Sequence, residues 1–150
     1  MKHYVVCGFS GVGKSTAEQR HNNVVDFESS GFSHFWAGEK YGEKNPDFPQ
    51  NYIDALCEEL KKEKRCIYLI SCHEEVRKEL KERGVDYVIV MPKFADKNEY
   101  LKRWLRRGSP IEFVKLMDAR WVAMHTSCEN DTAPKIYLED YEYIDDVLPT

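Results

Sequence analysis

Short apolar runs recur along the chain and are separated by longer stretches in which apolar residues return every three or four positions. Short runs bounded by Gly, Pro, Asn or Asp are typical of strands buried in a sheet. We therefore expect five strands, at residues 4–7, 24–27, 66–70, 85–91 and 135–138.

The stretches between these runs carry a helical period. In residues 51–64, Tyr52, Leu56 and Leu60 recur at every fourth position, and charged residues fill the opposite face. Similar patterns predict four more helices, from residue 14 to 20 or 21, from 73 or 74 to 84, from an Asp96 cap to 108, and beyond residue 110 through residues 113–124. Residues 31–49 show no clean period, which is typical of a binding loop.

Strands that alternate with helices indicate an α/β fold. Such strands pair in parallel through right-handed crossovers, so that helices cover both faces of the sheet. We expect a five-stranded parallel sheet in a single domain spanning residues 1–150, since 42% hydrophobic residues suffice for one core. Ligands bind at the carboxyl ends of the strands in open sheets of this kind. The expected site therefore brings together residues 8–15, 26–30, 71–73 and the segment after Met91.

Composition argues against several classes of partner. The formal net charge of −4 argues against nucleic acid as the main partner. The chain contains neither a long apolar run nor a signal-peptide pattern, so we expect a cytoplasmic protein that does not enter a membrane. Its five cysteines are odd in number and form no C-x-x-C pair, which favours reduced, buried thiols over a disulfide framework or a zinc site.

The most specific motif follows the first strand. The stretch Gly8-Phe9-Ser10-Gly11-Val12-Gly13-Lys14-Ser15 fits G-x-x-x-x-G-K-[ST] at every defined position. Its glycines let backbone N–H groups point into one concavity that holds phosphate oxygens, and the following helix adds its positive end. Lys14 would bridge the β- and γ-phosphates, and the Ser15 hydroxyl would bind Mg²⁺. The residues expected to bind ATP are Gly8, Ser10, Gly11, Val12, Gly13, Lys14, Ser15 and Thr16; an ordinary glycine-rich turn is the alternative.

The order of these features resembles the small P-loop nucleoside monophosphate kinases. The loop, the strand ending in Asp26-Phe27-Glu28-Ser29-Ser30, the aromatic segment, the strand ending in Ser71-Cys72-His73 and an arginine-bearing helix are most similar to the short, adenylate kinase-like deoxynucleoside monophosphate kinases of phages. This resemblance implies a P-loop NTPase fold with a short arginine-bearing lid, and lid arginines among Arg103, Arg106 and Arg107. No Asp follows Ile70, so the usual Walker-B carboxylate is missing there.

Arginines supply candidate chemistry outside the loop. Arg103, Arg106 and Arg107 are spaced by three and four residues, so one helix can direct them to a common side. Guanidinium groups stabilise the charge that develops on transferring phosphoryl oxygens. We assign Arg103 and Arg107 to catalysis and Arg106 to the acceptor, with a solvated basic helix face as the alternative.

Carboxylates and aromatic residues after the second strand complete the candidate site. Asp26 and Glu28 alternate along a strand and should project to the same side near the loop. Asp26 would hold a Mg²⁺-bound water, and Glu28 would act in catalysis; a polar strand end bonded to its own turn is the alternative. The residues expected to bind the acceptor are Glu28, Ser29, Phe32, Trp36, Lys40 and Arg106, although the aromatic residues would equally suit a cover for the sheet edge.

These expectations combine into one function and two alternatives. The predicted function is Mg²⁺-dependent transfer of the γ-phosphoryl group of ATP to a (deoxy)nucleoside monophosphate, giving the diphosphate, by a monomer or homodimer. The first alternative is a P-loop kinase of another small metabolite. The second is a nucleotide-binding or slowly hydrolysing regulatory protein.

Overall fold

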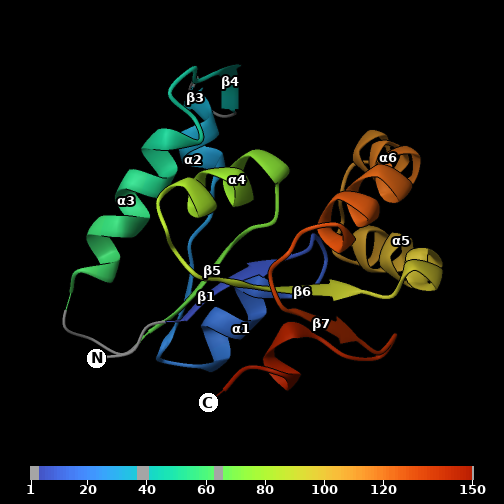
Figure 1. The fold of residues 1–150 in the computed structure, drawn as a ribbon. Coiled ribbons are helices and arrows are strands. Elements are labelled where there is room, and N and C mark those ends of the chain that lie inside the picture. Colours follow the sequence, from blue (N-terminus) through green and yellow to red (C-terminus); the bar gives the residue numbers. More distant parts are fainter. Residues whose placement is uncertain (1–3, 37–40, 63–65, 150) are drawn as a thin grey trace.

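The computed structural model describes residues 4–36, 41–62 and 66–149. Its main sheet contains five parallel strands in the order β2-β5-β1-β6-β7. Figure 1 labels β5, β1, β6 and β7 of this sheet. The strands are β1 (Tyr4–Gly8), β2 (Val24–Asp26), β5 (Ile67–Ser71), β6 (Val88–Pro92) and β7 (Lys135–Leu138). The five-stranded parallel sheet predicted from the sequence is confirmed. The largest difference between the predicted and the observed strand bounds is at β6, which begins at Val88 and not at Val85. The Val85 amide donates to the Leu80 carbonyl, so Val85 still belongs to the preceding turn.

Helices cover both faces of this sheet, as predicted. They are α1 (Lys14–Arg20), α3 (Gln50–Leu60), α4 (Glu74–Glu82), α5 (Lys97–Arg106) and α6 (Ile111–Glu129), with 3₁₀ turns η1 (Phe94–Asp96) and η2 (Ile144–Asp146). The chain crosses the sheet one way from β1 to β2 and the other way afterwards, so right-handed crossovers place α1 opposite the later helices. In Figure 1, α1 and the C-terminal segment lie on one face, and α3, α4 and α6 lie on the other.

The core lies between the sheet and these helices. Residues of β1 and β5 are almost entirely buried, as is expected of central parallel strands. Trp104 and Trp121, which sit at core spacing on their helices, are 0% and 1% exposed and make edge-to-face contact with each other. Each of these large apolar side chains contributes about 1.5 to 3 kcal/mol through burial, so they hold α5 and α6 together.

The segment expected to be irregular contains regular structure. Its described residues include a short helix, α2 (Ser30–Ser33), and an antiparallel pair, β3 (His34–Trp36) and β4 (Tyr41–Lys44). The prediction of a structureless loop was wrong because these elements are only three or four residues long, too short for a period to be read.

The predicted Asp96 cap is also wrong. Asp96 precedes α5, but its side chain makes no capping hydrogen bond, because η1 leads directly into the helix. Within the described residues, no helix combines the length and apolar character needed to cross a membrane.

Candidate functional site

The loop formed by residues 8–15, called the glycine loop below, lies at the carboxyl end of the central strand β1. Gly11 and Gly13 have φ angles of +87° and +96°, which L side chains rarely adopt, and α1 begins immediately afterwards at Lys14. The Val12 amide donates to the Phe9 carbonyl at 3.2 Å and closes a turn within the loop. Since β1 lies between β5 and β6 and the chain leaves β1 and β6 in opposite directions, the loop occupies the topological switch point of the sheet.

Lys14 folds back over the glycine loop. Its ammonium group donates to the Gly8 carbonyl at 2.9 Å. Burial lowers the pKa of Lys14, and the nearby Cys72, Asp26 and Glu28 oppose that shift. A partly desolvated ammonium beside a turn that opens a helix is suited to bind an anion.

Asp26 ends β2 on the same edge of the sheet. One of its oxygens, Oδ1, is buried and has no hydrogen-bond partner among the described residues. Burial raises the pKa of Asp26, and Lys14 acts in the opposite direction. Buried carboxylate oxygens are normally paired, so this one indicates room for a donor or a hydrated cation. The structure therefore brings Asp26 near the glycine loop, as the sequence predicts.

Glu28 is partly engaged by its own turn. Its Oε1 accepts hydrogen bonds from the Ser30 amide at 3.0 Å and from the Ser30 hydroxyl at 2.7 Å. Burial would raise the pKa of Glu28, but these two bonds and the charge of Lys14 outweigh it and lower the pKa. The side chain is therefore a carboxylate near Lys14, with one oxygen already occupied.

The predicted acceptor residues are only partly located. Phe32 stacks on Phe27 at 5.8 Å and packs against Tyr52 at 5.3 Å, so it belongs to an aromatic cluster that covers the sheet edge. Ser29 is buried, at 7% exposure. Lys40 and the side chain of Trp36 lie outside the described part of the structure.

Arg103 is fully occupied by the protein itself. Its guanidinium donates to the carbonyls of Gly11, Asp140 and Glu142, at 3.1, 2.9 and 2.6 Å. Its remaining donors face the Tyr100 hydroxyl and the Glu99 carboxylate, so all five N–H groups have partners. Arg103 therefore ties the glycine loop to the C-terminal segment.

The other two arginines take different partners. Arg106 is exposed and pairs with Glu99 at 2.9 Å. Arg107 donates to the Ser109 hydroxyl at 2.9 Å and lies over the Phe113 ring at 5.6 Å. The expectation that all three arginines share one side is not met, because Arg103 turns under the C-terminal segment while Arg107 turns toward α6.

Two residues near the glycine loop had no strong sequence signal. Tyr143 packs so closely that a Cβ on Gly13 would lie 2.9 Å from its Cδ1 atom, and its ring faces the Arg103 guanidinium at 4.0 Å. His73 follows β5, makes no capping hydrogen bond, and interacts electrostatically with Lys14 and Glu28. Burial lowers the pKa of His73. Only tertiary packing brings Tyr143 to the loop, although the strand order places His73 at the expected edge.

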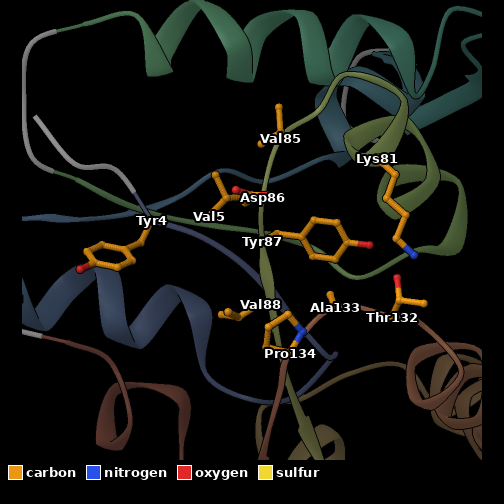
Figure 2. Close-up of a pocket in the computed structure, with 10 residues that line it drawn as sticks. All are labelled: Tyr4, Val5, Lys81, Val85, Asp86, Tyr87, Val88, Thr132, Ala133 and Pro134. Carbon is orange, nitrogen blue, oxygen red and sulfur yellow. The ribbon is translucent and has the colours of Figure 1, made fainter.

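A cavity of about 620 Å³ lies at the opposite, amino-terminal edge of the sheet, around the first residues of β1 and β6 (Figure 2). Two of its polar groups are already paired: the Lys81 ammonium and the Tyr87 hydroxyl both contact Asp131, at 2.9 and 2.8 Å. Because ligands of open α/β sheets bind at the carboxyl edge, the glycine loop is the better candidate site.

Comparisons with known proteins support the fold alone. No family model matches the chain, and no curated protein sequence matches it. The structure is similar to that of a tunicamycin resistance protein from Deinococcus radiodurans, with a TM-score of 0.59 and 18% identity over 97% of this chain and 90% of that one. The resemblance to nucleoside monophosphate kinases is therefore wrong: this structural match is a protein of a different class, and no sequence comparison supports the kinase family.

Proposed function

We propose that the glycine loop is a P-loop, which binds the phosphates of ATP with Mg²⁺, and that the chain transfers the γ-phosphoryl group to a small acceptor. The observation that carries this proposal is the loop itself. Two glycines with positive φ, a helix beginning at Lys14 and the Lys14 ammonium all meet at the switch point of the sheet.

The residues around the loop fit a magnesium nucleotide. The Ser15 side chain is exposed at the start of α1, where its hydroxyl would bind Mg²⁺. The buried oxygen of Asp26 fits a metal-bound water, since Mg²⁺ retains several waters when it binds a protein. Lys14 would leave the Gly8 carbonyl to contact the transferred phosphate, and Glu28 is the carboxylate near Lys14 that would take the proton from a hydroxyl acceptor.

The arginines divide into a support and a candidate lid. Arg103 acts as a positioning residue, because its donors hold the Gly11 carbonyl and the C-terminal segment. Arg106 and Arg107 are exposed, so a movement of either one toward a bound phosphate would break no buried hydrogen bond. A short lid would therefore use these two arginines.

The acceptor is proposed to bind between Glu28 and Lys14, beside β5. A nucleoside monophosphate remains the acceptor expected from the sequence. Tunicamycin is a second compound to test, because the structurally similar protein is named for resistance to it. A nucleotide-binding protein without an acceptor is the second candidate function, and it is favoured by the full engagement of Arg103.

The experiment measures ADP and phosphorylated product from ATP and Mg²⁺ with ribo- and deoxyribonucleoside monophosphates, nucleosides and tunicamycin. Lys14→Ala should lower the rate by roughly 10² to 10³, because one lost contact to transition-state charge is worth about 3 to 4 kcal/mol. Lys61→Ala, at the exposed lysine that directly follows α3 and pairs with Glu58, is the matched control and should be neutral.

The outcomes separate the two candidates. Product formation that depends on Lys14 supports the transferase. ATP binding that depends on Lys14 without product from any acceptor supports the nucleotide-binding protein. A folded Lys14→Ala protein that binds ATP as the wild type does would overturn both.

A further inference from the structure

Two cysteines that are 56 residues apart in sequence meet behind the glycine loop. The Sγ atoms of Cys72 and Cys128 lie 3.3 Å apart, and both thiols are free. Cys72 directly follows β5, whose last residue, Ser71, is the register partner of Gly8. Cys128 lies in the last turn of α6 and is 2% exposed, while Cys72 is half-buried.

One guanidinium group holds the backbone on both sides of this pair. Arg77 Nε donates to the Cys72 carbonyl at 3.0 Å, and Arg77 Nη1 donates to the carbonyl of Ser127, the residue before Cys128, at 3.2 Å. The same guanidinium pairs with Asp131 at 2.8 Å and is only 4% exposed. Since these contacts fix the ends of β5 and α6, the two sulfurs are held close together in the folded protein. Bringing them into contact therefore costs little further conformational entropy.

The charges around the pair also favour thiol chemistry. The hydrogen bond from the Cys72 thiol lowers the pKa of Cys128, burial opposes this, and the positive Arg77 adds to the lowering. The same interaction and burial raise the pKa of Cys72. A lowered pKa increases the share of Cys128 that is thiolate, and the thiolate is the nucleophile in thiol oxidation.

We propose that Cys72 and Cys128 form an oxidative modification site that hydroperoxides convert to an intramolecular disulfide. The proposal does not depend on the function of the glycine loop. It rests on the short sulfur–sulfur distance and on the anchoring of both cysteines by Arg77.

The chemistry balances with hydrogen peroxide as the named oxidant. Cys128 attacks one peroxide oxygen, the O–O bond breaks, and a sulfenic acid and water form. The Cys72 sulfur then attacks the sulfenic sulfur, its S–O bond breaks, and a second water leaves. Two thiols are oxidised and one peroxide is reduced. The sulfurs must approach by roughly 1.3 Å to reach a disulfide bond of about 2.0 Å, a change within the reach of side-chain rotation.

The test is a disulfide map of the full chain after brief treatment with hydrogen peroxide. Alkylation under denaturing conditions should count five thiols before treatment and three afterwards, with a loss of two hydrogens from the intact mass. Trypsin should then yield residues 66–77 linked to residues 121–135. The first peptide also contains Cys66, so fragment ions, or the same map of a Cys66→Ser protein, must assign the bond to Cys72.

Variants and stability complete the test. Cys72→Ser and Cys128→Ser should each abolish the linked peptide, while Cys57→Ser, at a half-buried cysteine of α3, should retain it. The oxidised wild type should melt roughly 5 °C higher, because the bond constrains the unfolded chain, and dithiothreitol should reverse the shift. If a serine variant fails to fold, the disulfide map of the peroxide-treated wild type tests the proposal on its own. Five alkylatable thiols after peroxide, or bonds through other cysteines or between chains, would overturn the proposal.

Discussion

Replacing Arg103 by methionine separates a supporting arginine from a mobile lid arginine. The substitution keeps an unbranched side chain of similar reach and removes five donors. The carbonyls of Gly11, Asp140 and Glu142 then lose their partner, and the stacking of the guanidinium on Tyr143 is lost as well. These groups lie in two segments that are far apart in sequence, the glycine loop and residues 140–143, so the loss cannot be repaired within one turn.

The magnitude follows from these contacts. An unpaired, buried hydrogen-bonding group costs about 1 to 3 kcal/mol, and the interaction of a cation with an aromatic face is worth about 0.5 to 2 kcal/mol. The three carbonyls are only partly buried, so water can satisfy part of the loss. The methionine also regains some stability, because no guanidinium has to be desolvated. We therefore expect a loss of about 2 to 4 kcal/mol in the free energy of unfolding.

Urea unfolding followed by circular dichroism measures this loss. With a slope of about 2 kcal/mol per molar, the midpoint should fall by about 1 to 2 M. Arg106→Met is the matched control, since Arg106 lies one turn away, shares Glu99 and is 62% exposed; it should cost under about 1 kcal/mol. Equal, small losses of unfolding free energy in the two variants would refute the supporting role of Arg103. An Arg103→Met protein that keeps full stability but loses activity would indicate that Arg103 is a lid arginine.

Three further predictions concern the same edge and the core network. Gly13→Ala should cost more stability than Gly84→Ala, because both glycines have positive φ but only a Cβ at residue 13 meets Tyr143, and thermal melting compares them. Asp26→Asn should raise the melting temperature at pH 7 and lower Mg²⁺-dependent turnover. Burial raises the pKa of Asp26 when the chain folds, so its destabilising effect should develop as the pH rises through about 4 and above, and the variant should match the wild type at lower pH. Asp131→Asn should lower stability at neutral pH and flatten the acid unfolding curve. Burial alone would raise the pKa of Asp131, but its hydrogen bonds and ion pairs hold it far below the usual range, so this stability is present above pH 4 and lost on acidification.

The hydrophobic pattern alone determined the elements of the main sheet and the place of the glycine loop. The period of the hydrophobic residues and the Gly, Pro, Asn and Asp residues that interrupt it are local properties of the sequence. The five strands and the starts of α1 and α4 could therefore be predicted within a few residues. The loop motif and the strand that leads into it are contiguous, which is why the sequence alone assigns Gly8 to Ser15 to the carboxyl edge of the sheet.

Tertiary structure decided which distant residues surround that loop. The role of Arg103 depends on carbonyls near residues 11, 140 and 142, and helical spacing on α5 contains no information about them. Tyr143 reaches Gly13 because η2 packs beside α1, and Cys128 reaches Cys72 because α6 returns across the sheet. These contacts join segments whose separation along the chain hides them from any local pattern, since they form only when strand order and crossover handedness fold the chain back on itself.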